Sequence, residues 1–212
     1  TLVWHQQTPD WVFENDAGDP LSREALMARM EDHIGTVAGR YRGKINGWDV
    51  VNEALNEDGS LRETKWLQII GEDYLEKAFT FADEAAPDAE LYYNDYNLWK
   101  PEKREGAIRL VKNLFDKGIR VDGIGMQGHY SLTHPEVAQV EASIQAFSDL
   151  GVKVMITELD VDVLPRRGSE GADLDIQQKS ADKLNPYTKG LPGGIQQQLA
   201  ERYAELFTLF HK

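Results

Sequence analysis

Apolar residues in this chain gather in short dense runs that are separated by longer stretches with helical spacing. The dense runs predict five strands, at Leu2–His5, Ile45–Glu53, Ala89–Asn94, Gly123–Gly128 and Lys153–Asp160. Their side chains are apolar on both faces, which is typical of strands buried inside a parallel sheet.

Between and after these strands, apolar residues recur every three or four positions and predict helices. These helices are expected at Ser22–Tyr41, Lys65–Ala86, Pro101–Lys117, from Thr133 to Gly151, and at Ile195–Lys212. The strict order of strand then helix predicts a parallel sheet with covering helices. The segment Leu164–Gly194 has no clear period, and a loop of this length in a compact domain is usually functional or mobile.

The position of the polar residues distinguishes a barrel from an open nucleotide-binding sheet. The first strand is not followed by the glycine-rich turn that a dinucleotide site requires. Polar residues instead follow several different strands, as in barrel enzymes that build their sites at the carboxyl ends of the strands. We therefore predict an α/β fold of the (β/α)8 TIM-barrel type, with residues 1–212 forming one partial catalytic domain of about five β/α units.

Composition excludes several classes of function. The net charge of −13 argues against a nucleic-acid partner, whose phosphates require lysine and arginine. No apolar run reaches the roughly 20 residues of a membrane helix, and no signal peptide is visible. The chain has no cysteine, and its five histidines lack the paired spacing of a metal site, so we expect no metal and no cofactor.

Two glutamates stand out because each ends an apolar strand. A carboxylate at such a position is costly to ionise unless it faces a solvated cleft. Glu53 or Glu158 alone could equally be half of an ion pair at the rim of the sheet. Two such glutamates, each flanked by further polar residues, favour paired acid and base chemistry.

Four short motifs containing these residues occur together in order. They are LVWH with PDW at Leu2–Trp11, WDVVNEA at Trp48–Ala54, GIGMQGH at Gly123–His129 and ITELD at Ile156–Asp160. In this order they resemble the family 10 glycoside hydrolases, which are endo-β-1,4-xylanases, and the similarity covers essentially the whole chain. Each motif alone is weak, whereas four in the family's order are specific.

The resemblance implies a role for each matching residue. Glu53 corresponds to the family's general acid/base and Glu158 to its nucleophile, the two carboxyl groups of a retaining glycosidase. Asn52 corresponds to the residue that hydrogen-bonds the sugar's 2-hydroxyl, and Gln127 and His5 match further positions in the same subsite. His5 could instead be a core histidine, and Gln127 could cap a strand end.

The resemblance also implies supporting and stacking residues. His129 is expected to contact the nucleophile and to be held by Asp160, although Asp160 could simply begin a turn. Tyr96, in the NDYN motif, matches the family's tyrosine on the leaving-group side. Trp11 lies in a loop and is a second candidate for stacking on sugar, whereas Trp4, Trp48 and Trp66 are expected in the core.

The chain departs from the family in what it lacks. It matches the third to the seventh strand of the eight-stranded barrel, without the Glu-Asn and Lys motifs of the first two strands or the tryptophan of the eighth. The missing strands are expected on another chain or in another part of the gene. The expected substrate is xylan or a xylo-oligosaccharide, hydrolysed internally with retention by a secreted or cell-surface enzyme. The alternatives are a retaining endo-glycanase acting on another β-1,4 glycan and a sugar-binding barrel without activity.

Overall fold

The computed structural model of the chain describes residues 1–164 and 185–212. Most of the irregular segment predicted at Leu164–Gly194 therefore lies outside the described residues. The chain divides into two compact units, one formed by Thr1–Gln127 with Ala142–Glu158 and the other by Gly128–Glu141 with Leu159–Lys212.

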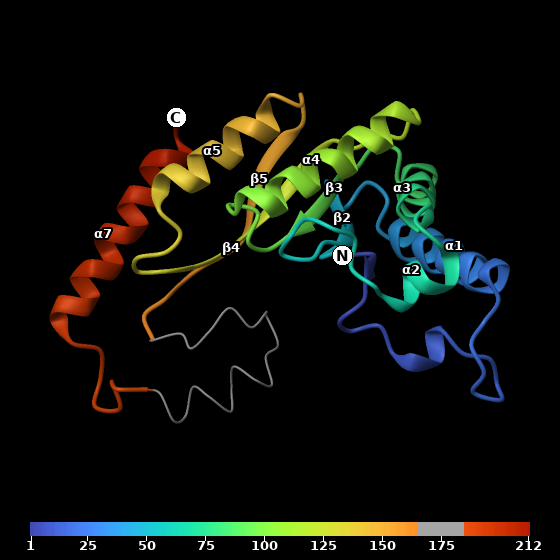
Figure 1. Ribbon diagram of the computed structural model, residues 1–212, viewed down its shortest axis with the longest axis horizontal. Coiled ribbons are helices and arrows are strands. Elements are labelled where there is room, and N and C mark those ends of the chain that lie inside the picture. Colours follow the sequence, from blue (N-terminus) through green and yellow to red (C-terminus); the bar gives the residue numbers. More distant parts are fainter. Residues whose placement is uncertain (165–184) are drawn as a thin grey trace. The chain divides into compact units, whose positions relative to one another are not determined.

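The strands form one five-stranded sheet whose spatial order follows the chain (Figure 1). They are β1 (Val3–Trp4), β2 (Gly47–Asn52), β3 (Glu90–Asp95), β4 (Gly123–Ser131) and β5 (Lys153–Asp162). The pairs from β1 to β4 are parallel. The five predicted strands are thus confirmed, although β4 and β5 extend beyond their predicted ends. A parallel sheet in chain order with alternating helices is part of a (β/α)8 barrel.

The helices alternate with the strands as predicted, except that the helix expected from Thr133 begins at Val137 and that one expected helix is divided. They are η1 (Asp10–Val12), α1 (Arg23–Arg40), α2 (Lys65–Ile70), α3 (Tyr74–Ala85), α4 (Pro101–Asp116), α5 (Val137–Ser148) and α7 (Gly193–Phe210). The single helix predicted at Lys65–Ala86 is wrong, because two helices occupy it. Gly71 ends α2 with a φ of 102°, a left-handed conformation that interrupts the helix and that glycine adopts easily.

Helix α1 shows how the apolar spacing becomes packing. The Ser22 hydroxyl caps its first turn by accepting a hydrogen bond from the Ala25 amide. Leu26, Met30 and Ile34 follow at intervals of four and are buried on one side of the helix. This face packs against α3, which in turn packs on β2 (Figure 1). The hydrophobic stripe thereby fixes the layer that supports the first half of the sheet.

The register of the strands decides which side chains meet at their carboxyl ends. Asn52, the last residue of β2, pairs with Asn94 of β3, and Asn94 pairs with Gly125 of β4. Parallel strands end at the same edge of a sheet, so the polar residues after β2 and β3 lie side by side there. This edge carries the candidate site.

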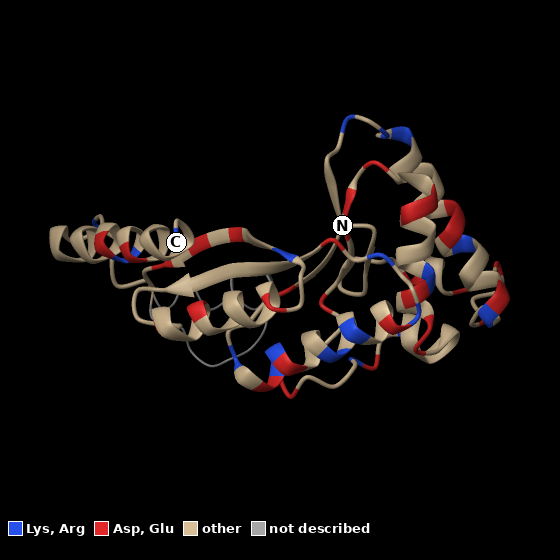
Figure 2. Cartoon of the chain, turned by 90° about the horizontal axis from the view of Figure 1, so that it is seen from above, with Lys and Arg blue, Asp and Glu red and all other residues tan. Residues whose placement is uncertain are grey.

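Charge and hydropathy add little to the functional picture. Lys and Arg are scattered among more numerous Asp and Glu along the described part of the chain (Figure 2). Among the described residues, no helix is both long and apolar enough to cross a bilayer.

Candidate active site

The two glutamates singled out by their place in the sequence share an unusual backbone conformation. Glu53 has a φ of 57° and Glu158 a φ of 54°. Among the described residues, the only other non-glycine residue with a positive φ is Asn97. A left-handed conformation costs a residue with a Cβ about 1–2 kcal/mol, and such strain gathers at functional sites. The backbone thus marks these two positions independently of any motif.

Hydrogen bonds among buried amides connect the two carboxyl groups. Gln127 Nε2 donates to Glu53 Oε1 over 3.2 Å and to Asn52 Oδ1 over 3.0 Å. Asn94 Nδ2 donates to the same Asn52 oxygen over 3.0 Å and to Glu158 Oε1 over 3.1 Å. Glu53 is 5 % exposed, whereas Glu158 is exposed at the sheet edge. The network gives the two carboxyl groups different surroundings within one site.

The hydrogen bond from Asn94 to Glu158 depends on the glycine at position 125. The Asn94 side chain lies across β4 at Gly125, where an added Cβ would be 2.3 Å from Asn94 Oδ1 and 3.2 Å from the Thr157 methyl group. Thr157 donates its hydroxyl to the same Asn94 oxygen over 2.7 Å. Any larger residue at 125 would push Asn94 away from Glu158.

The polar atoms of this cluster are not all paired. Gln127 is 3 % exposed, and its Oε1 has no hydrogen-bond partner among the described residues. A buried acceptor without a partner is costly, and a donor from a bound ligand would satisfy it. The Asn52 amide finds partners in either orientation, because after a flip its oxygen accepts from Trp4 Nε1 at 3.3 Å and its nitrogen donates to Asn94 O at 3.0 Å.

Arg62 connects the backbone of Glu53 to Tyr96. Its Nε donates to the Glu53 carbonyl over 3.1 Å, and its Nη2 donates to the Tyr96 hydroxyl over 3.0 Å.

Burial, and secondarily the charge of Arg62, lower the pKa of His5 to about 4. His5 is therefore a neutral imidazole at neutral pH, able to both donate and accept one hydrogen bond.

A fully buried ion pair lies below Tyr96. Lys103 Nζ is 2.9 Å from Asp95 Oδ1, and neither side chain is exposed. The Tyr93 hydroxyl and the Tyr96 amide also donate to the Asp95 carboxyl group. Complete burial raises the pKa of Asp95 to about 6, although Lys103 and Tyr93 act in the opposite direction.

This raised pKa predicts how stability depends on pH. Between about pH 4 and pH 6 the folded protein holds a proton on Asp95 that the unfolded chain has lost, so the stability contributed by this group falls as the pH rises. The free energy of unfolding of the wild type, relative to Asp95→Asn, is expected to fall by about 2–3 kcal/mol over this range. Urea unfolding of both proteins at several pH values measures it. A difference that does not change with pH would contradict the prediction.

Two predicted residues lie together in the second unit. His129 Nδ1 is 2.6 Å from Asp160 Oδ2, which agrees with the expected support of His129 by Asp160. The contact of His129 with Glu158 stays a prediction. In the first unit Trp11 lies in η1 and is 68 % exposed, and the cluster of Asn52, Glu53, Asn94, Gln127 and Glu158 does not include it. Trp48 and Trp66 are buried, as expected, whereas Trp4 is only half-buried.

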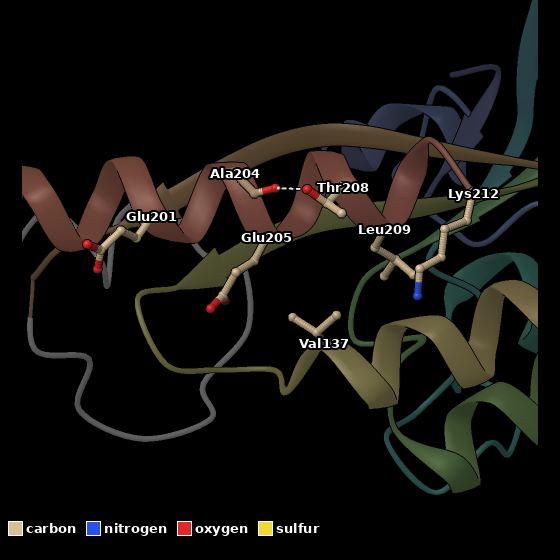
Figure 3. Close-up of a pocket in the computed structure, with 7 residues that line it drawn as sticks. All are labelled: Val137, Glu201, Ala204, Glu205, Thr208, Leu209 and Lys212. Atoms are coloured by element: carbon tan, nitrogen blue, oxygen red, sulfur yellow. Dashed lines mark hydrogen bonds between the residues drawn. The ribbon is translucent and has the colours of Figure 1, made fainter.

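The second unit also has an open groove between α7 and the start of α5 (Figure 3). It is lined by Val137, Glu201, Ala204, Glu205, Thr208, Leu209 and Lys212. These residues include no aromatic ring on which a sugar could stack, and Lys212 forms an ion pair with Glu141. The groove has the character of ordinary surface between two helices.

Three residues of the site were not assigned a specific role from the sequence. Asn94 is one of the polar residues that end a strand, but no motif gave it a particular function. Lys103 lies one turn before Ala107 and two turns before Leu110, on the apolar side of α4, and a charge on that side was a visible signal. Arg62 lies in a loop, and nothing in its sequence surroundings marks it.

Comparison with known proteins places this geometry in context. A model of glycosyl hydrolase family 10 matches residues 1–212. The endo-1,4-beta-xylanase A of Xylanibacter ruminicola is 45 % identical over 212 residues, which are 100 % of this chain and 58 % of that protein. The endo-1,4-beta-xylanase of Geobacillus stearothermophilus is also 45 % identical, over 99 % of this chain and 60 % of its own length. The chain therefore spans about three fifths of these relatives.

Solved structures agree with the sequence relatives. A family 10 endoxylanase retrieved from a sugarcane soil metagenome has a TM-score of 0.90 at 44 % identity, over 99 % of this chain and 59 % of that chain. The intracellular xylanase of Thermoanaerobacterium saccharolyticum has a TM-score of 0.77 at 38 % identity, over 99 % of this chain and 60 % of its own. Two glutamate-to-alanine variants of that enzyme were solved, one with xylotetraose and one with xylotriose.

Proposed function

Because this chain belongs to glycosyl hydrolase family 10, we propose that its protein hydrolyses internal β-1,4 bonds of xylan with retention of anomeric configuration. The relatives that it matches over its whole length carry the name endo-1,4-beta-xylanase. Since the chain spans about three fifths of those relatives, the activity is proposed for the complete product of the gene.

The proposed reaction uses the two glutamates in two steps. Glu158 attacks the anomeric carbon while the glycosidic C–O bond breaks and Glu53 gives its proton to the leaving oxygen. Glu53, now a carboxylate, then takes a proton from water, whose oxygen displaces Glu158 from the same carbon. Two inversions at one carbon leave the configuration unchanged.

The observation that supports the proposal most directly is the network of hydrogen bonds that links the two glutamates. Asn52, Asn94 and Gln127 connect Glu53 to Glu158, and both glutamates have left-handed backbones. In the Thermoanaerobacterium saccharolyticum enzyme, the two glutamates replaced by alanine lie 105 positions apart. Glu53 and Glu158 are separated by the same number of positions. This equal spacing supports assigning the two chemical roles to these residues.

The neighbouring residues suit the binding of a neutral sugar. In this proposal Asn52 binds the 2-hydroxyl, and the unpaired Gln127 Oε1 accepts from another hydroxyl group. His5, a neutral imidazole, joins the same subsite. His129, held by Asp160, orients the nucleophile.

Two aromatic residues complete the proposed binding surface. Tyr96 forms the platform for the sugar on the leaving-group side of the scissile bond. Trp11, exposed in η1, would stack on a sugar farther along the substrate chain. Such stacking fits a neutral polymer, which offers apolar ring faces but no charge.

A direct assay tests the substrate. The complete protein is expected to release oligosaccharides from xylan and to act far more slowly on cellulose or mannan. Equal or greater activity on another β-1,4 glycan would favour the alternative endo-glycanase. Binding of xylo-oligosaccharides without any hydrolysis would favour a sugar-binding barrel.

Stereochemistry tests the mechanism separately from the substrate. The first product seen by proton NMR is expected to be the β-anomer, and the carboxyl groups of Glu53 and Glu158 should lie about 5–5.5 Å apart in a crystal structure. If the α-anomer forms first, the enzyme inverts and the covalent step on Glu158 does not occur.

We also propose that the enzyme works outside the cytoplasm, because xylan is a polymer too large to enter cells. One structural relative is named intracellular, so family membership alone does not decide the compartment. Xylanase activity measured in the culture medium, on washed cells and in lysate tests this proposal. Activity confined to the lysate would overturn it.

A further inference from the structure

Lys103 is a buried charge that the proposed reaction does not use. It lies in the first turn of α4 and its side chain has no exposed surface. A lysine is almost never fully buried unless it is paired, because its ammonium group loses its hydration. Here the ammonium is 2.9 Å from Asp95 Oδ1 and 3.3 Å from Glu57 Oε1.

The third neighbour of this ammonium is the ring of Tyr96. Lys103 Nζ lies 3.5 Å from the ring centroid, a close cation–π contact. With the ammonium against one face of the ring, a sugar can stack only on the opposite face. The contact therefore fixes both the position of the ring and the face that is available.

Two further contacts hold the same tyrosine. Its hydroxyl accepts from Arg62 Nη2, and its amide donates to Asp95 Oδ1 over 2.8 Å. Asp95 thus binds the Tyr96 backbone and the lysine under the ring at once. Arg62 extends the connection to the carbonyl of Glu53. The ring, its hydroxyl and its backbone are each held by a charged group.

We propose that Lys103 is a positioning residue that, together with Asp95, holds Tyr96 in place as a platform for the leaving-group sugar. This inference rests on the proposed xylanase function. A purely structural ion pair would affect activity on every substrate alike. A positioning role acts through Tyr96 and therefore affects mainly substrates with a sugar on the leaving-group side of the scissile bond.

The test compares two substrates in the complete protein. Xylohexaose places sugars on both sides of the bond, whereas β-xylobiosyl fluoride has only a fluorine atom on the leaving-group side. Asp95→Asn combined with Lys103→Met removes both charges and so leaves no unpaired ion in the core. The expected loss in kcat/KM is about tenfold for xylohexaose, carried mainly by KM, and much smaller for the fluoride.

Lys100→Met is the matched control. Lys100 lies just before the same helix and forms an ion pair with the same Glu57, but it is partly exposed and lies over Trp99 rather than Tyr96. It is expected to keep wild-type kinetics on both substrates. If the double variant does not fold, Asp95→Asn combined with Lys103→Gln, which removes both charges and keeps a hydrogen bond between the two side chains, takes its place.

A double-mutant cycle with Tyr96→Ala separates positioning from stability. If Lys103 acts through Tyr96, removing the charges in the Tyr96→Ala protein should cost no further activity on xylohexaose. Equal losses on both substrates, or a full additional loss in the Tyr96→Ala background, would overturn the inference while leaving the proposed function intact. A wild type that hydrolyses neither substrate would overturn both.

Discussion

Replacing Glu158 by alanine is expected to lower hydrolysis of every substrate by a factor on the order of 10⁵–10⁶, the scale for removing a covalent nucleophile. Glu158 lies at the sheet edge, where Asn94 donates to its Oε1. Among the described residues near it, Glu53 is joined to the opposite end of the hydrogen-bonded cluster and cannot replace it in the attack. The loss should therefore be equally severe for xylan and for activated aryl glycosides, as measured by initial rates.

An exposed glutamate provides the control for this substitution. Glu63→Ala likewise removes one exposed carboxylate, here from a loop, and is expected to leave the rates unchanged. Circular dichroism and urea unfolding should show both variants folded, because Glu158 is exposed and its loss leaves no cavity. Substantial residual activity of Glu158→Ala on activated substrates would remove Glu158 from the role of nucleophile.

Much of this architecture follows from the sequence because the relevant signals are local. A dense apolar run becomes a buried parallel strand, and the polar residue that ends it lies at the carboxyl edge of the sheet. Glu53 and Glu158 were identified in this way, whereas the roles of Asn52 and Gln127 were implied by the family resemblance. The register that pairs Asn52 with Asn94 brings the polar residues after β2 and β3 together.

The rest depends on interactions that a single segment does not encode. The spacing of apolar residues over Lys65–Ala86 is compatible with a single helix. The break between two helices is seen only in the left-handed backbone of Gly71. The apolar period of α4 predicts its buried side but not how a lysine is accommodated there, since its partners are Asp95, the last residue of β3, and Glu57, in the loop after β2. The left-handed backbones of Glu53 and Glu158 are imposed by their surroundings, because glutamate has no intrinsic preference for that conformation.

Replacing Glu53 by alanine should give a different result from the loss of Glu158, because the cost depends on the leaving group. Hydrolysis of xylan, whose leaving oxygen needs a proton, should slow by a factor of about 10²–10⁴. A dinitrophenyl β-xylobioside needs little protonation, so Glu158 should still form the covalent intermediate rapidly. The second step should become limiting, because water loses its general base, and a burst of dinitrophenol followed by slow turnover should be visible by stopped-flow absorbance.

Azide then identifies which carboxylate was removed. The Glu53→Ala variant leaves space and no negative charge on the face from which water attacks, so azide can enter and displace Glu158 from the anomeric carbon. Because azide attacks the α-linked intermediate from the opposite face, the product should be the β-glycosyl azide, and turnover should rise with azide concentration. Glu53→Gln, which keeps a polar group next to Gln127 and fills the space, is expected to show the burst with weaker rescue. An α-glycosyl azide from Glu53→Ala, or two alanine variants that behave alike on the activated substrate, would show that the roles of Glu53 and Glu158 are assigned wrongly.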